Sequence, residues 1–371
     1  MQVFVIIFFV AVALQVIYLF VFNIALNKKA SAKSTVTFNS ATEPVSIIVC
    51  AHDEEQNLRE LLPLLLNQNY QDFEVIVVND RSNDNTYDYL LDLSKTDGRV
   101  RIVNVDRIPP HVNGKKYSLT LAIRAAKYEW LLFTDADCRP EGNNWIRSMS
   151  SAFQENTQFV LGFSPYVKTK GLLNLFIRFE TLLTALQYVS FGLMKNPYMG
   201  VGRNLAYRKS FFLAEKGFNQ FMNVTGGDDD LYVNQHANGA NTSIILGQDA
   251  TIHTFAEKSW GDFLHQKKRH LSVGKHYKFK HRFWLGLFLT SWLVSWLTLI
   301  PALLFSNLYI VVVALMAVRV LTLVFALRTS LQRFGHNFEL WTVPFLDFLF
   351  SIYYLTTGLI TLGSNNVRWK N

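Results

Sequence analysis

The sequence predicts a membrane-anchored α/β protein: a mainly parallel sheet covered by helices, with one transmembrane helix before it and a transmembrane helical region after it. Three observations lead to this fold class. Long apolar runs occupy both ends of the chain, short β-branched runs alternate with amphipathic segments between them, and several of the short runs end on acidic residues. Near-continuous apolar strands are typical of parallel sheets, because helices cover both of their faces.

Residues 1–27 predict an uncleaved transmembrane anchor. From Val3 to Phe22 the only clearly polar residue is Gln15, and about 20 apolar residues cross a hydrocarbon core as a helix. A secretory signal would begin with basic residues, whereas here they follow the apolar run, at Lys28, Lys29 and Lys33. By the positive-inside rule the chain after a linker at 28–44 is cytoplasmic. We expect an integral protein of a bacterial inner membrane.

Residues 283–363 predict a second membrane region of about three spans, followed by a tail at 364–371. The apolar stretches are Trp284 to Phe305, Leu308 to Leu327 and Leu340 to Gly363. Arg319 and Asp347 interrupt them, and charges at such depth are costly, so they form either a structural pair or part of an acceptor or translocation path. The topology stays open: four spans would place the C-terminus outside, yet Arg368 and Lys370 lie there.

The charge and the cysteine content narrow the function classes. The net charge is +8, from 36 basic and 28 acidic residues, but much of the excess flanks the apolar spans. Anionic lipids and phosphorylated substrates explain this better than nucleic acid does, and no basic helix or finger motif is present. Two cysteines are too few for a disulfide framework, and no Cys/His cluster predicts zinc.

Between Pro44 and about Ala256 the pattern alternates between strands and helices. Strands are predicted at 45–51, 74–80, 99–105 and 129–135, with helices at 54–68, 82–93 and 116–127 between them. Open sheets of this order bind ligands at the carboxyl ends of their strands. Neither a GxxxxGK loop nor a GxGxxG fingerprint is present, so a glycine-rich phosphate cradle is excluded.

Acidic residues stand where those strands end. Asp135 and Asp137 are two residues apart, so on extended chain their side chains point to the same side. Carboxylates together with diphosphate oxygens suit a hard divalent cation. The alternative is that they are turn-forming aspartates ahead of Pro140.

Several segments carry a resemblance to a known family, in the family's own order: SIIVCAHDEEQNL, VVNDRSNDNT, NGKKYSLTLA, FTDADCRP, TGGDDDLYVN and QKKRH. Together they resemble the family 2 glycosyltransferases, which are inverting, use nucleotide-diphosphate sugars and have the Rossmann-like GT-A fold. The resemblance covers residues 45–282. It implies that Ala51, Asp53 and Asp80 bind the nucleotide and that Lys115 and Lys116 pair with phosphate. FTDADCRP looks like the DxD element, in which Asp135 and Asp137 hold Mg²⁺ or Mn²⁺ and Asp135 also contacts the donor.

The same resemblance assigns the acceptor side. Asp228, three residues before Leu231, matches the family's general base, although Gly227 replaces the usual Glu. Asp229 and Asp230 are alternatives, and a solvated acidic loop is the reading without the resemblance. Gln266 and Arg269 of QKKRH match the acceptor motif, with His270 where Trp is usual; a basic collar on the membrane is the other reading.

Two segments between these motifs complete the predictions. GVGRNLAYRKSFF resembles the family segment beside the donor sugar, which places Gly202, Arg203 and Asn204 near the site. Residues 171–194 are strongly apolar with few charges and predict an interfacial helix that rests the domain on the bilayer.

The leading hypothesis is therefore an inverting hexosyltransferase that uses a nucleotide-diphosphate sugar, UDP-sugar by preference, and a lipid-linked or membrane-proximal glycan acceptor. One alternative is a processive polysaccharide synthase coupled to export. Another, of a different class, is a membrane scaffold or transporter that binds nucleotide sugars without catalysis.

Overall fold

The computed structural model describes residues 2–31 and 43–362, which divide into two compact units. The sheet unit takes the described residues of Ser34–Val167 and Gly192–Ala256, and the helical unit takes those of Met1–Lys33, Lys168–Phe191 and Glu257–Asn371. The domain predicted at 45–282 therefore contributes to both units. The tail at 364–371, most of the linker at 28–44, and Lys33, Arg368 and Lys370 lie outside the described residues.

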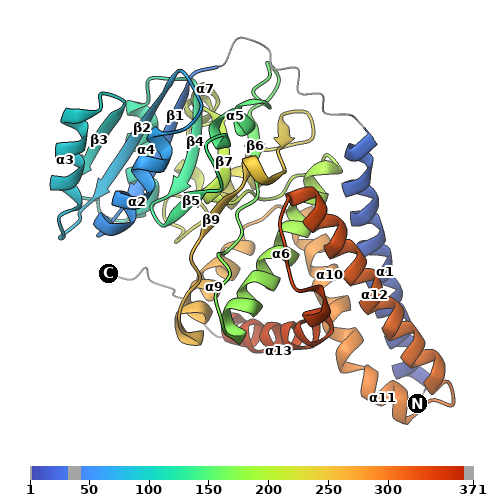
Figure 1. The fold of residues 1–371 in the computed structure, drawn as a ribbon. Helices are drawn as coiled ribbons and strands as arrows, with labels where there is room; N and C mark the ends of the chain where they lie inside the picture. Colours follow the sequence, from blue (N-terminus) through green and yellow to red (C-terminus); the bar gives the residue numbers. More distant parts are fainter. Residues whose placement is uncertain (1, 32–42, 363–371) are drawn as a thin grey trace. The chain divides into compact units, whose positions relative to one another are not determined.

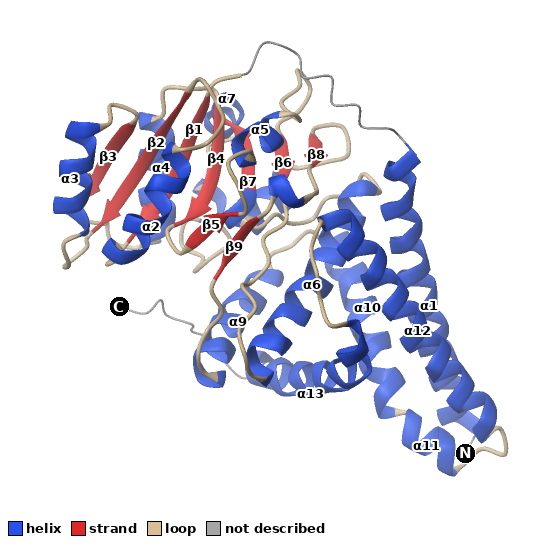
Figure 2. Ribbon diagram, in the orientation of Figure 1, coloured by secondary structure: helices blue, strands red, loops and turns tan. Residues whose placement is uncertain are grey.

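The sheet unit is built on a seven-stranded sheet in the order β3-β2-β1-β4-β7-β6-β8 (Figure 1, with β8 labelled in Figure 2). Strands β3, β2, β1 and β4 are parallel, and β7 runs antiparallel to both of its neighbours. This confirms the predicted mainly parallel sheet. The strands are β1 (Val45–Ala51), β2 (Phe73–Asp80), β3 (Val100–Val105), β4 (Trp130–Asp135), β6 (Phe159–Leu161), β7 (Leu205–Arg208) and β8 (Thr242–Ile244).

A second, two-stranded sheet pairs β5 (Cys138–Pro140) antiparallel with β9 (Ile252–Thr254). Because β5 begins three residues after β4 ends, this pairing fixes the turn that carries Asp137. The unit also contains short 3₁₀ turns, η1 (Gly202–Asn204), η2 (Asn219–Phe221) and η3 (Gln248–Ala250).

Helices cover both faces of the parallel strands, as the near-continuous apolar runs require. On one face, Leu58 and Leu61 of α2 pack in one buried cluster with Ile47 of β1. On the other face, Leu119 of α4 lies beside Ile48 and Phe133. The helices of this unit are α2 (Glu55–Leu66), α3 (Thr86–Thr96), α4 (Gly114–Ala125), α5 (Trp145–Ser150), α7 (Lys209–Ala214) and α8 (Asp230–His236).

The helical unit contains two helices that are long and apolar enough to cross a membrane, over Val3–Lys28 and Tyr309–Phe334. The expected span at Trp284 to Phe305 is broken at Thr298 into two helices, and the one expected at Leu340 to Gly363 begins with a 3₁₀ turn, η4 (Leu340–Thr342). The helices are α1 (Gln2–Ser31), α6 (Leu172–Leu193), α9 (Trp260–Gly274), α10 (Phe279–Leu297), α11 (Leu299–Leu304), α12 (Tyr309–Phe334) and α13 (Val343–Leu362).

Polar side chains join these helices. Gln15 of α1 donates to Phe288 O at 2.6 Å and to Ser291 Oγ at 2.7 Å, both on α10, and Asn23 donates to Thr329 of α12 at 2.9 Å. Most of the apolar side chains of α6, the predicted interfacial helix, are buried, and they pack on aromatic residues of α1, α9 and α13. Its apolar character therefore serves protein packing within this unit.

One buried carboxylate, Glu74, connects the amino ends of the parallel strands. Its Oε1 accepts hydrogen bonds from Ser46 Oγ at the start of β1 and from the Lys127 N–H before β4, both at 2.6 Å. Its Oε2 lies 3.0 Å from Arg101 of β3. One side chain at the start of β2 therefore connects β2 to β1 and β3 and to the residues that precede β4.

Replacing Glu74 with Leu should lower the free energy of unfolding by about 2–4 kcal/mol, because three buried or half-buried donors lose their acceptor. Thermal unfolding of the detergent-purified protein measures this as a drop of several degrees in Tm. Asp92→Asn on exposed α3 is the control. An unchanged Tm in Glu74→Leu would show that the strands do not depend on this carboxylate.

Candidate active site

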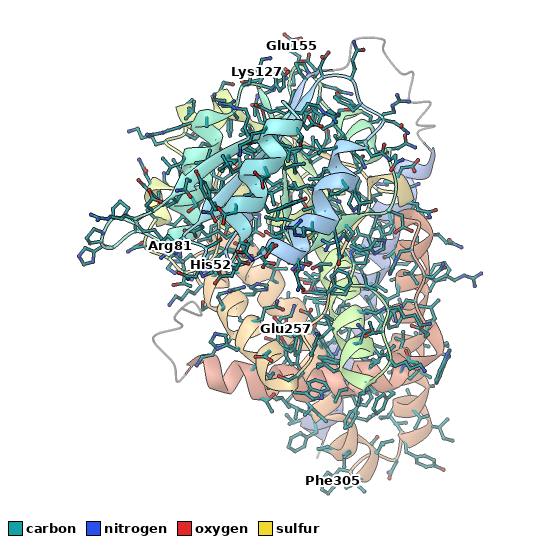
Figure 3. The ribbon with its side chains drawn as sticks, turned by 60° about the vertical axis from the view of Figure 1, so that its left-hand side comes forward. His52, Arg81, Lys127, Glu155, Glu257 and Phe305 are labelled. Carbon is teal, nitrogen blue, oxygen red and sulfur yellow. The ribbon has the colours of Figure 1, made fainter. Side chains whose placement is uncertain are left out.

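The carboxyl ends of β1, β2 and β4 meet at one edge of the sheet (Figure 2). In the register, Cys50 of β1 lies opposite Asp135 of β4, and Ala51 opposite Asn79 of β2. Figure 3 shows His52 and Arg81, which follow β1 and β2, near each other and away from Lys127 at the opposite end of the sheet. The acidic strand ends are therefore brought together at the predicted edge.

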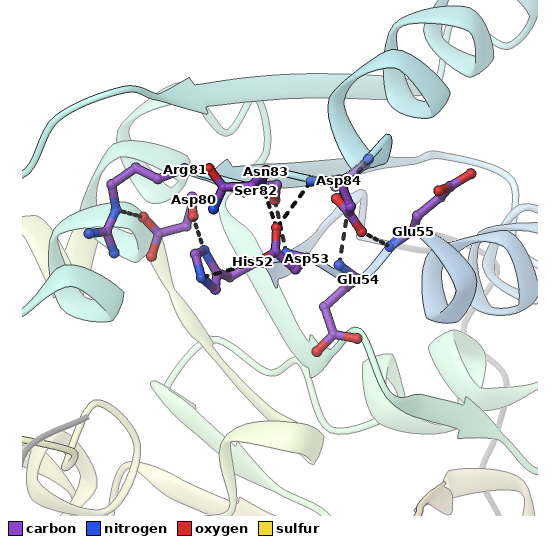
Figure 4. Close-up of polar contacts among 10 residues, drawn as sticks. His52, Asp53, Glu54, Glu55, Asp80, Arg81, Ser82, Asn83 and Asp84 are labelled. Atoms are coloured by element: carbon purple, nitrogen blue, oxygen red, sulfur yellow. Dashed lines mark hydrogen bonds and ion pairs between the residues drawn. The ribbon is translucent and has the colours of Figure 1, made fainter. Parts of the chain in front are cut away.

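The loops after β1 and β2 are hydrogen-bonded to each other (Figure 4). Asp53 Oδ1 accepts from the Asn83 N–H at 2.6 Å and from the Asp84 N–H at 3.3 Å, and the Asp53 N–H donates to Ser82 Oγ at 3.0 Å. Asp53 has a φ of 55°, an uncommon conformation for a non-glycine residue. Its carboxylate thus shapes the loop and remains 42% exposed.

Asp80 ends β2 beside the start of α4. Its Oδ1 accepts from Arg81 Nε at 2.9 Å. A Cβ added at Gly114 would lie 3.8 Å from Asp80 Oδ2 and only 2.7 Å from Ile108 Cδ1, so the glycine permits the close approach of α4. Ala51 is buried at the end of β1.

Lys115, in the first turn of α4, connects two carboxylates from distant parts of the chain. Its Nζ lies 3.2 Å from Asp135 Oδ1 and 3.3 Å from Asp228 Oδ2. These three residues line one pocket together with Cys50, Gly202, Tyr207 and Asp229. The predicted metal-binding element, phosphate lysine and base are therefore neighbours in space.

The ionisation of this cluster follows from its charges. Burial raises the pKa of Asp228, but the charges of Lys115 and Lys116 outweigh burial and lower it overall. Burial and the negative charge of Asp228 raise the pKa of Asp229, whose oxygens accept from the N–H groups of Gly202 and Asp230, both at 2.7 Å. Asp228 is thus ionised and partly accessible, whereas the carboxylate of Asp229 is occupied by the backbone N–H groups of Gly202 and Asp230.

Asp137 and Asp135 form a second acidic pair. Asp137 Oδ2 accepts from Thr254 Oγ1 of β9 at 3.0 Å. Its pKa is raised, first by burial and then by the negative charge of Asp135, while Arg203 opposes the rise. Two carboxylates whose mutual repulsion would be relieved by a cation fit a hard divalent ion.

The described residues contain no group of three or more His, Cys, Asp or Glu side chains that could hold a metal ion. Asp135 and Asp137 would therefore supply only part of a coordination shell. Mg²⁺ is commonly bound by one or two carboxylates with substrate phosphates and water as its other ligands, and this donor set fits that pattern.

Of the other predicted site residues, Gly202 and Arg203 lie beside the acidic residues, whereas Asn204 belongs to the core of the sheet unit and Gln266 and Arg269 belong to the helical unit. Arg203 is near the acidic pair and donates to Tyr166 Oη at 3.1 Å, and Gly202 contacts Asp229. Asn204 is fully buried and bonds to Phe163 O, Ala250 O and Trp145 Nε1, so its amide serves the core. Gln266 and Arg269 lie on α9 in the helical unit, where Gln266 Nε2 donates to Glu257 at 3.3 Å.

Some members of the site were not expected from the sequence. Thr254, Cys50 and Tyr207 are ordinary strand residues in sequence. The pairing of β5 with β9 brings Thr254 to Asp137, that of β1 with β4 brings Cys50 opposite Asp135, and that of β4 with β7 brings Tyr207 to the pocket. Lys116, expected at phosphate, is 0% exposed and its ammonium group binds backbone carbonyls instead.

An open, mainly parallel sheet with an acidic pocket at its carboxyl edge defines an α/β ligand-binding protein. The model of glycosyl transferase family 2 matches residues 46–213, and that of glycosyl transferase family group 2 matches residues 130–327, more than half of the chain. The chain belongs to the family 2 glycosyltransferases.

The individual relatives share less than a third of their residues with this chain over the aligned segments. An uncharacterized glycosyltransferase of Haemophilus influenzae is 28% identical over 155 residues, which are 42% of this chain and 44% of the relative. A poly-beta-1,6-N-acetyl-D-glucosamine synthase of Staphylococcus epidermidis is 27% identical over 124 residues, 33% of this chain and 28% of the relative. The chain thus spans less than half the length of these curated relatives.

Among solved structures, the mannosyltransferase PcManGT from Pyrobaculum calidifontis, in complex with GDP-Man and Mn²⁺, matches with a TM-score of 0.57 at 17% identity. The match covers 95% of this chain and 99% of that chain. This similarity confirms the predicted GT-A fold.

Replacing Lys115 with Met should destabilise the protein near pH 8 and much less near pH 5. In the wild type the lowered pKa of Asp228 contributes stability that is present at neutral pH and lost as pH falls through that pKa. Without the lysine the buried carboxylates repel each other, their pKa values rise, and protonation on acidification relieves the repulsion. Thermal unfolding across this pH range, with exposed Lys127→Met as control, measures the difference; a destabilisation that does not change with pH would contradict it.

Proposed function

We propose that the protein is an inverting glycosyltransferase that moves a sugar from a nucleotide-diphosphate sugar to a hydroxyl of a lipid-linked or membrane-proximal glycan. One observation carries the proposal: Lys115, Asp135 and Asp228 converge in one pocket at the carboxyl edge of the sheet, in a chain of glycosyltransferase family 2. A protein that only binds nucleotide sugars has no need of an ionised, partly accessible carboxylate there.

The residues have distinct roles in this proposal. Asp228 accepts the proton of the acceptor hydroxyl while the oxygen of that hydroxyl bonds to the anomeric carbon of the donor sugar. The bond from that carbon to the diphosphate breaks on the opposite face, and the nucleoside diphosphate leaves with the electron pair. A single displacement inverts the configuration at that carbon. Lys115 lies where its charge would stabilise both the carboxylate and the departing phosphate.

The donor site would lie along the strand ends. Ala51, Asp53 and Asp80 border the position of the nucleoside, with UDP favoured as the nucleotide. Asp135 and Asp137 would hold Mg²⁺ or Mn²⁺, which when bound offsets the negative charge of the diphosphate. Mn²⁺ and a nucleotide sugar accompany the mannosyltransferase of similar fold.

The membrane assignment supports the choice of acceptor. In the part of the chain that the structure describes, two helices have the length and composition of membrane spans, so an acceptor carried on a lipid would be held at the same surface as the enzyme. We propose that the sheet unit is cytoplasmic and that Gln266 and Arg269 of α9 contribute to the acceptor side.

A processive polysaccharide synthase is the second candidate, favoured by the similarity to a synthase of Staphylococcus epidermidis. His270 in place of the family's Trp argues for single addition. Product length decides between them: one added sugar supports the transferase, and a ladder of products supports the synthase.

The first test is a thermal-shift panel of UDP, GDP, CDP and ADP, each with Mn²⁺, with Mg²⁺ and without metal. A ligand that binds only the folded protein raises its Tm. Stabilisation by one nucleotide that requires metal supports the proposal and identifies the donor class. If no nucleotide changes the Tm with any metal, the proposal fails.

The division of roles between the carboxylates predicts separable defects. Asp228→Asn should reduce turnover by about 10²–10⁴-fold, because the base is lost, and leave metal-dependent nucleotide binding nearly unchanged. Asp135→Ala should lose both. Transfer of radiolabelled sugar and calorimetric nucleotide binding measure the two properties, with Asp92→Asn as control. Equal loss of nucleotide binding in both variants would contradict these roles.

A further inference from the structure

Lys116 follows the pocket lysine directly but serves a different part of the structure. It is 0% exposed, and its Nζ lies 3.0 Å from Phe221 O and 2.5 Å from both Val224 O and Gly226 O. An ammonium group has three N–H donors and no acceptor, so three carbonyl oxygens satisfy it fully. Lys116 therefore has no donor left for a phosphate.

The three carbonyls belong to the segment 221–227, which directly precedes the acidic residues Asp228 to Asp230. Phe221 ends the 3₁₀ turn η2, and its carbonyl also accepts from the Val224 N–H at 3.0 Å. Val224 and Gly226 lie in bends outside any helix or strand. A buried carbonyl without a partner is costly. The ammonium group of Lys116 supplies donors to the carbonyls of Val224 and Gly226 and a second donor to that of Phe221.

A second set of contacts joins α4 to the same segment. The Asn113 N–H donates to Met222 O at 3.0 Å, and the Asn113 side chain caps α4 by accepting from the Lys116 N–H at 3.2 Å. Gly226 and Gly227 have φ values of 80° and 79°, which an L side chain rarely adopts. The segment therefore makes a sharp turn at its end, and two residues at the start of α4, Asn113 and Lys116, both bind it.

We propose that Lys116 is a positioning residue for the transfer reaction: by binding three carbonyls of segment 221–227 it fixes where Asp228 stands relative to Lys115 and Asp135. The expected effect on kcat rests on the proposed function. The expected effect on the position of segment 221–227 rests on the geometry alone. The two neighbouring lysines have different contacts, because successive residues of a helix point about 100° apart. Lys115 balances the charge of Asp228, and Lys116 sets its place.

The charge on Lys116 matters to this arrangement. Burial lowers its pKa to about 8, although the carboxylates of Asp228, Asp230 and Asp229 oppose the change. Loss of the proton leaves two N–H donors for three carbonyls. The attachment should therefore weaken as pH rises above about 8.

The test compares Lys116→Met, Lys116→Arg and, as matched control, Lys127→Met at the exposed end beyond α4. Lys116→Met should lower kcat by about 100-fold, the effect of misplacing a catalytic group by about 1 Å, while the Kd for the nucleoside diphosphate changes less than about threefold. Lys116→Arg keeps its charge at every pH, so it should retain more activity than Lys116→Met. Its activity should also decline at higher pH than that of the wild type.

A kcat of Lys116→Met within about threefold of the wild type would overturn the proposal, and so would nucleotide binding lost in parallel with turnover. Hydrogen–deuterium exchange gives a readout that needs no activity: the amides of 221–230 should exchange at least about tenfold faster in Lys116→Met than in the control. Unchanged exchange overturns the proposal. A wild type that transfers no sugar would instead refute the proposed function, and exchange would still decide the role of Lys116.

Discussion

The charge balance around Lys115 is the interaction on which the pocket depends. Three carboxylates, Asp135 from one segment and Asp228 and Asp229 from another far along the chain, line this pocket, and enclosing them together without a cation would be strongly unfavourable. The ammonium of Lys115 makes this possible because it contacts two of them at once, and the charge of Lys116 adds to its effect on Asp228. The same charge keeps Asp228 ionised, which is the state a base requires.

The sheet determines where that ammonium can stand. Parallel pairing of β1 with β4 places Cys50 opposite Asp135, and α4 returns to the same edge because its cap, Asn113, follows β3. Gly114 lets the helix approach Ile108 and Arg81 more closely than a side chain would allow. The packing of α4 on the sheet thus brings Lys115 to Asp135 at the end of β4, and segment 221–227, which Lys116 binds, brings Asp228 to Lys115.

Much of this could be predicted from the sequence, and the exceptions share a physical cause. The four parallel strands and their acidic ends follow from apolar runs and turn chemistry, and the GT-A fold followed from the motifs. Lys116 could not be predicted to be buried, because lysine is almost always exposed unless paired, and its partners are backbone groups that carry no sequence signature. The core role of Asn204 and the contact of Thr254 with Asp137 could not be predicted either, since both depend on tertiary contacts between distant segments.

The buried charges of the helical unit favour one of the two roles open to them. Arg319 of α12 and Asp347 of α13 are both 0% exposed and form a two-contact ion pair, and the guanidinium lies 4.6 Å from the ring centre of Trp292 on α10. A bidentate pair satisfies both carboxylate oxygens, and the aromatic face covers the cation. Neither group is left open to a passing ligand. These contacts favour the role of a polar connection among three helices over that of an acceptor path.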